Sequence, residues 1–233
     1  ISQMTRKASI CVNANKDIVL KKTREYYSNL GADVISTENL EISKKEYDSH
    51  FKKILAGESP EKLLPRPFAL FEQSNWTFLV WDFEGLDPIL ATFFSKSLTA
   101  EVISIDTSSI IGYEHYSHLR NGKIVKLYTA LEDGATIIEA ENVLDGGKVE
   151  KYKKAKDKNH MSNEALQWEA LNYFGKLNPL EITIETGFPK NAEFYRIENL
   201  HRNYSDRLIT NMKDPSFREI LYKPKGRIIP PAS

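Results

Sequence analysis

Residues 77–106 read "TFLVWDFEGLDPILATFFSKSLTAEVISID", and in this stretch two short apolar runs flank one longer segment. The runs 77–82 and 101–106 are rich in β-branched and aromatic residues, which is typical of buried strands. Between them, Pro88 fits the first turn of a helix, and Asp87 before it fits the N-cap. The stretch therefore predicts a β-α-β unit.

The same layout occurs upstream of this stretch. The run "KASICVNA" (7–14) predicts a strand, residues 15–31 predict a helix, and "DVIST" (33–37) predicts a second strand. Asn15 suits the N-cap of the helix and Gly31 suits its end. An apolar stripe along it predicts the buried face, which comprises Val19, Thr23, Tyr26 and Leu30, with Leu20 and Tyr27 beside them.

The two units are joined by "SKKEYDSHFKKILAGESPEKLLPRP" (43–67). Its first half is helix-like, because Tyr47, Phe51, Ile54 and Leu55 form one stripe. Gly57 ends this pattern, and three prolines then predict an irregular connector. The segment as a whole is typical of a hinge or a linker.

The stretch "GYEHYSHLRNGKIVKLY" (112–128) carries two of the five histidines. Its Asn121-Gly122 pair predicts a tight hairpin turn, because both positions need a positive φ. A regular hairpin would place Leu119 opposite Ile124 and His115 opposite Tyr128, on a face shared with Tyr113. His115 and His118 would then point to opposite faces, and Glu114 would lie roughly 13 Å from His118 along the strand. This geometry argues against a metal site or an acid–base pair here.

The rest of the chain predicts further elements. Residues 133–144 predict a strand, 145–160 a loop, 163–177 a helix, 180–186 a strand and 191–211 an amphipathic helix. The predicted class is α+β, with mixed sheets built from two β-α-β units and a hairpin, flanked by helices. We expect residues 4–150 to form one α+β region and 151–233 a second region, either separate or part of the same domain.

Charge and cysteine content limit the functional classes. The 233 residues have a net charge of zero, which argues against general nucleic-acid binding. Residues 72–114 nevertheless hold seven acids and one base, whereas 147–160 hold six lysines and two acids. One cysteine, Cys11, excludes a disulfide framework within the chain and predicts a buried thiol in a reducing cytoplasm. No apolar run approaches the 18 residues of a membrane span.

Catalytic motifs are missing from the sequence. It contains no GxGxxG, GxxxxGK[ST], GxSxG or HExxH pattern. We therefore predict no catalytic residues, no cofactor and no metal.

The residues 76–108 ("WTFLVWDFEGLDPILATFFSKSLTAEVISIDTS") and 113–128 ("YEHYSHLRNGKIVKLY") resemble modules of bacterial polymorphic-toxin immunity proteins. The likeness is one of layout: a Trp-bearing strand, a helix, a Val/Ile strand and a hairpin with an Asn-Gly-Lys turn. It implies a non-catalytic inhibitor that binds a cognate toxin, and the acidic middle of the chain would suit a basic toxin domain.

The leading hypothesis is therefore a non-enzymatic, cytoplasmic, protein-binding protein that occludes a toxin's active site. Two alternatives stay open: an enzyme with a carboxylate and histidine site, and a regulatory module that binds a small ligand. The corner 76–87 and the hairpin 113–128 supply the expected partner-binding residues, which are Trp76, Trp81, Asp82, Glu84, Asp87, Tyr113, His115 and Tyr128.

Overall fold

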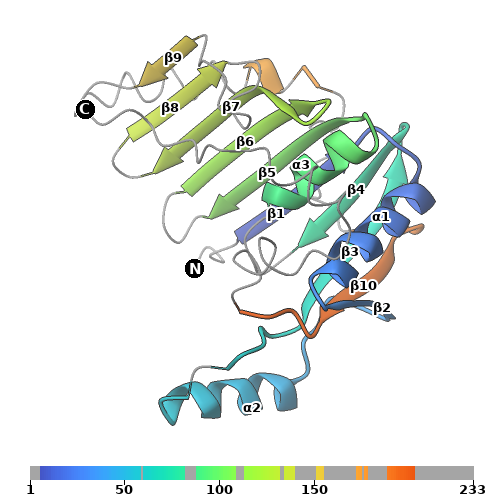
Figure 1. Ribbon diagram of the computed structural model, residues 1–233, viewed down its shortest axis with the longest axis vertical. Helices are drawn as coiled ribbons and strands as arrows, with labels where there is room; N and C mark the ends of the chain where they lie inside the picture. Colours follow the sequence, from blue (N-terminus) through green and yellow to red (C-terminus); the bar gives the residue numbers. More distant parts are fainter. Residues whose placement is uncertain are drawn as a thin grey trace.

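The computed structural model describes residues 6–58, 60–81, 88–108, 113–131, 134–139, 151–154, 172–174, 176–177 and 188–202. Within these residues, ten strands form one sheet in the order β2-β10-β3-β4-β1-β5-β6-β7-β8-β9 (Figure 1). The strands are β1 (Arg6–Val12), β2 (Asp33–Thr37), β3 (Arg66–Gln73), β4 (Trp76–Trp81), β5 (Glu101–Ser108), β6 (Tyr113–Arg120), β7 (Lys123–Leu131), β8 (Gly134–Glu139), β9 (Lys151–Lys154) and β10 (Glu193–Glu198).

Both predicted β-α-β units are present, and the α+β class is confirmed. The helix α1 (Lys16–Asn29) joins β1 to β2, and α3 (Pro88–Ser97) joins β4 to β5. In each unit the two strands run in the same direction but are not neighbours, because other strands lie between them. Every hydrogen-bonded strand pair in the described residues is consequently antiparallel.

The helix α1 follows the predicted pattern closely. The Asn15 side chain accepts a hydrogen bond from the Asp17 amide at the N-terminus. At the other end Gly31 has a φ of 73°, and its amide donates to the Ser28 carbonyl, while the Ala32 amide donates to Tyr27. This is a Schellman ending, which a left-handed glycine makes possible.

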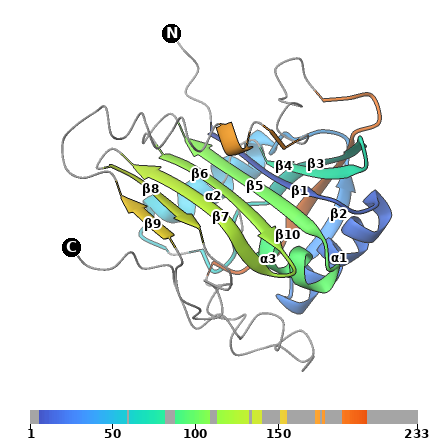
Figure 2. The same cartoon turned by 90° about the horizontal axis from the view of Figure 1, so that it is seen from above.

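The sheet has two apolar faces. On one face, α1 and α3 cover residues such as Ile10, Leu79 and Leu127, and the Tyr26 and Phe93 rings meet 5.4 Å apart. On the other face, Cys11, Phe78 and Tyr128 pack with Phe174 of the short helical segment 172–174. Figure 2 shows α1 and α3 beneath the sheet and segment 172–174, in orange, above it. Cys11 is 1% exposed, as expected for a buried thiol, and its burial raises the pKa of the thiol.

Residues 193–198 form a strand, and the prediction of a helix there is wrong. This strand, β10, fills the space between β2 and β3, with Phe194 opposite Thr37 and Ala69. Tyr195 and Ile197 point into the core, so burial alternates with a period of two. The apolar residues of "EFYRIE" fit the period of a helix as well as that of a strand. Pairing with the edges of β2 and β3 selects the strand.

Part of the predicted loop 145–160 is also a strand, because β9 pairs with β8. The sheet thus contains strands from both 4–150 and 151–233. The predicted strand 180–186, most of the predicted helix 163–177 and residues 203–211 lie outside the described part of the chain. None of the described helices is long and apolar enough to cross a membrane.

Candidate functional site

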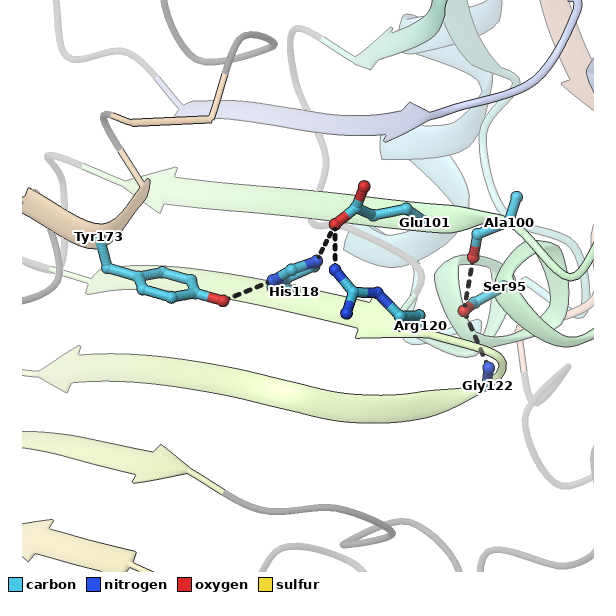
Figure 3. Close-up of polar contacts among 7 residues, drawn as sticks. All are labelled: Ser95, Ala100, Glu101, His118, Arg120, Gly122 and Tyr173. Atoms are coloured by element: carbon cyan, nitrogen blue, oxygen red, sulfur yellow. Dashed lines mark hydrogen bonds and ion pairs between the residues drawn. The ribbon is translucent and has the colours of Figure 1, made fainter.

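The hairpin turn between β6 and β7 forms as predicted. Asn121 and Gly122 have φ values of 53° and 73°. The Gly122 amide donates to the Ser95 hydroxyl at 2.9 Å, and that hydroxyl donates to the Ala100 carbonyl at 3.0 Å (Figure 3). The buried serine therefore fixes the turn against the C-terminal end of α3.

The register of this hairpin differs from the prediction. Leu119 lies opposite Ile124 as expected. A bulge between His118 and Leu119 then shifts by one residue every pair that lies farther from the turn. His115 consequently pairs with Thr129, and Tyr128 pairs with Tyr116. The predicted pairing of His115 with Tyr128 is wrong, because the Asn-Gly turn sets the register only as far as the first irregularity of the strand.

His115 and His118 do point to opposite faces of the sheet. His115 lies opposite Asp106, whose neighbour on β1 is Ala8 of the helix-covered core. His118 lies on the other face, where Tyr116 and Tyr128 pack. Burial lowers the pKa of His115, although the carboxylate of Asp106 opposes this effect.

His118 is the centre of a polar cluster that the hairpin alone does not reveal. Its Nε2 lies 2.6 Å from a Glu101 carboxylate oxygen on β5, and its Nδ1 lies 2.7 Å from the Tyr173 hydroxyl (Figure 3). Arg120 donates to the same Glu101 oxygen at 3.0 Å. The ammonium of Lys126 lies 4.5 Å from the centre of the Tyr173 ring.

The environment of this cluster favours a neutral histidine. Burial lowers the pKa of His118 and outweighs the opposing effect of Glu101. Burial raises the pKa of Glu101, but hydrogen bonds from Arg120 and His118 outweigh it and leave that pKa below its usual value. A neutral ring donates from one nitrogen only. The carboxylate must receive that hydrogen from Nε2, so Nδ1 accepts from the Tyr173 hydroxyl.

The hydrogen bonds around His118 indicate a structural role for this cluster and not a catalytic one. Both ring nitrogens of His118 are engaged by protein groups, so neither is available to a metal in this arrangement. Among the described residues, no three His, Cys, Asp or Glu side chains are grouped so that they could hold a metal ion. Through Tyr173, the cluster fastens segment 172–174 to the face of the sheet opposite α1 and α3.

The predicted partner-binding residues have different positions. Trp76, Trp81 and Tyr128 are buried, and their exposed fractions are 8%, 3% and 1%. They pack in the two cores and leave little surface for a partner. His115 is half-buried, and the backbone of Tyr113 belongs to β6. Asp82, Glu84 and Asp87 lie outside the described residues.

The helix α2 (Lys44–Leu55) exposes apolar side chains to solvent, whereas the predicted partner-binding residues Trp76, Trp81 and Tyr128 are buried. Gly57 ends it as predicted, at a φ of 76°. At its start Ser43 and Glu46 form a capping box. None of its residues is buried. The predicted stripe is instead exposed, by 52% at Tyr47, 52% at Phe51, 48% at Ile54 and 76% at Leu55. We call these four side chains the α2 apolar face.

A polar contact between Glu46 and Arg196 joins the helix to the body. Glu46 accepts hydrogen bonds from the Ser43 amide and hydroxyl, and Arg196 of β10 lies 3.3 Å from it. The hydrogen bond from Ser43 lowers the pKa of Glu46, and the charge of Arg196 adds to this effect. Figure 1 shows α2 projecting from the end of the molecule where β2 and β10 lie.

Clefts separate α2 from the rest of the structure. One cleft of about 950 Å³ has Glu46, His50 and Lys53 on its α2 side, with Lys62 and Arg196 opposite. A second, of about 310 Å³, lies between Tyr47 and Trp81, and a third, of about 400 Å³, lies beside Ile54. The helix is therefore accessible from more than one side.

The sequence reveals the α2 stripe but not its exposure, because an apolar stripe looks the same in a buried helix and in a docking helix. It also does not reveal the contact between His118 and Glu101, which depends on the pairing of β5 with β6. Comparison of the chain with known protein families, with curated proteins and with solved structures found no match.

Proposed function

We propose that this chain is a non-enzymatic protein that binds another protein through the α2 apolar face. The observation that carries this proposal is the exposure of Tyr47, Phe51, Ile54 and Leu55 on one side of a helix that buries nothing. Burying a side chain of this kind contributes roughly 1.5–3 kcal/mol. Clustered exposed apolar groups of this size are typical of interaction sites.

The proposed partner is a toxin, and the proposed setting is the cytoplasm. The layout of residues 76–108 and 113–128 supports this class, through its resemblance to immunity proteins. In this proposal α2 docks on the toxin and the body of the chain occludes the toxin's active site. The acidic residues Asp82, Glu84 and Asp87 remain candidates for contacts with the toxin.

Photocrosslinking tests the docking surface even while the partner is unidentified. A benzophenone amino acid replaces Leu55 in one full-length variant and Lys21, an exposed residue of α1, in a matched control. We expect a discrete adduct with one protein from the Leu55 variant in the cells that make this chain, and none from the control. Equal labelling from both positions, or no adduct from either, would contradict the proposal.

A titration then tests the class of partner. The captured protein, purified, should bind the chain with submicromolar affinity and should lose a toxic activity on binding. Binding without any loss of activity would retain the docking surface and reject toxin neutralisation.

A further inference from the structure

The spacing of the α2 apolar face matches one mode of recognition. Tyr47, Phe51, Ile54 and Leu55 stand at positions i, i+4, i+7 and i+8, which one side of a helix brings into line. This is the pattern by which an amphipathic helix lies in an apolar groove of a partner. Twelve residues give a helix of roughly 18 Å, which is enough for about three turns of contact.

The exposed charges beside this face are mostly positive. Lys44, Lys45, Lys52 and Lys53 are exposed, and Asp48 is the one exposed acid on the helix. The other acid, Glu46, is engaged by Ser43 and Arg196. On a helical projection Lys44 and Lys52 stand in the row next to Phe51 and Leu55, with Asp48 between them in the same row. A partner surface that complements these lysines therefore has carboxylates along the edge of its apolar site.

The shape of the site favours a concave partner over a flat one. Tyr47 and Ile54 line the 310 Å³ and 400 Å³ clefts, so these two side chains face spaces between α2 and the body. Leu55, by contrast, is 76% exposed and lines neither cleft. A membrane surface would contact one side of the helix, whereas the wall of a groove can also enter the cleft.

From this spacing, charge and shape we infer that α2 inserts as a helix into an apolar groove with an acidic rim on a partner protein. The inference rests on the proposed function and specifies the chemistry of the partner. Phe51 and Leu55 are the central anchors, Tyr47 and Ile54 contact the walls, and the lysines pair with the rim.

Calmodulin is a suitable probe, because it is an acidic protein whose calcium-loaded form exposes a methionine-rich apolar groove. The full-length chain is titrated into fluorescently labelled calmodulin, with calcium and then with chelator. We expect micromolar binding with calcium and none with chelator. Phe51→Ala and Leu55→Ala should each weaken binding by about tenfold or more, as loss of a buried anchor does.

Charge variants test the rim. Lys52→Glu should weaken binding and reduce its dependence on salt, whereas Lys21→Glu on α1 should leave both unchanged. Circular dichroism of each variant confirms that the fold is kept. Failure to bind calcium-loaded calmodulin, or binding that Phe51→Ala, Leu55→Ala and Lys52→Glu all leave unchanged, would overturn the inference.

Two further measurements distinguish a partner groove from two other possible occupants of the α2 apolar face, a membrane surface and a second copy of the chain. Tighter binding to vesicles with anionic lipid than to calmodulin, dependent on Phe51, would overturn the groove in favour of a membrane surface. Self-association in sedimentation that Leu55→Ala abolishes would overturn it in favour of a second copy. A Leu55 crosslink without calmodulin binding would reject only the groove, whereas loss of both would reject the proposed function as well.

Discussion

His118 illustrates how single residues in this protein depend on partners from distant parts of the chain. Glu101, seventeen positions away, accepts from one ring nitrogen, and Tyr173 lies within hydrogen-bonding distance of the other. The charge effects on His118 have opposite signs, since Glu101 raises its pKa and Arg120 lowers it. Burial is the largest effect and leaves the ring neutral near pH 7.

The opposing charges give a signed prediction for two variants. Glu101→Gln should lower the pKa of His118 further, because it removes the carboxylate that favours the charged ring. Arg120→Gln should raise that pKa, because it removes a like charge. NMR titration of the His118 ring protons measures both, and shifts of the same sign in the two variants would show that this description of the cluster is wrong.

The lowered pKa also predicts how stability depends on pH. The unfolded chain binds a proton at His118 near pH 6.5, whereas the folded chain does so only at lower pH. The stabilisation from neutral His118 is therefore complete above pH 6.5 and is lost as the pH falls below it. His115, whose pKa is also lowered, adds to the same loss.

Urea unfolding at pH 7.5 and pH 5.5 tests this dependence. We expect the wild-type chain to be less stable at the lower pH, and His118→Gln to show a smaller difference between the two conditions. A wild-type stability that rises on acidification over this range would contradict the assignment of neutral, buried histidines.

The elements that form most predictably are those whose sequence signals all agree. α1 combines a cap, an apolar stripe and a terminal glycine, and the two β-α-β units follow the sequence. By contrast, β10 has both helical and strand periodicity, and only its neighbours β2 and β3 select the strand. The bulge at His118 has no local signal, so the hairpin register beyond it cannot be predicted from the Asn-Gly turn.

The turn at Gly122 gives a prediction at the level of the hairpin. Gly122→Ala places a side chain at a φ of 73°, and its Cβ would lie 1.8 Å from Lys96 Cγ. The left-handed backbone alone should lower the free energy of unfolding by about 1–2 kcal/mol. Asn121→Gly, at the exposed neighbouring position, should change it by less than about 0.5 kcal/mol. Chemical denaturation measures both, and equal effects would argue against the turn geometry.

Two helices of similar length should differ in local stability. α1 buries Val19, Tyr26 and Tyr27, whereas α2 buries nothing and is held by its capping box and Arg196. A helix of this length is marginal without tertiary packing. We therefore expect amides of α2 to exchange much faster than those of α1.

Ser43→Ala sharpens this test. Loss of the capping box should speed exchange in α2 by roughly fivefold, equivalent to about 1 kcal/mol, and should leave α1 unchanged. Native-state hydrogen exchange followed by mass spectrometry resolves the two segments. Strong protection of α2 in the free chain would mean that it is packed.

For the molecule as a whole, the order of the strands is the feature least accessible to sequence reasoning. β10 follows β9 in sequence but lies at the other end of the sheet, between β2 and β3. The periodicity of a strand does not indicate which other strands pair with it. The predicted aromatic contact surface illustrates the consequence, since Trp76, Trp81 and Tyr128 fill the cores of the sheet. Four of the six exposed large apolar side chains among the described residues lie on α2 instead.

Both proposals require that the α2 apolar face is open to a partner in the free chain. Hydroxyl-radical footprinting of the full-length protein measures this exposure directly, with Phe68 and Phe71 as buried references at 0% exposure. We expect rapid oxidation of Tyr47 and Phe51, at the same rate at low and high protein concentration, and little oxidation of the two references. Protection of Tyr47 and Phe51 to the level of Phe68 would show that the face is already covered, and would contradict both proposals.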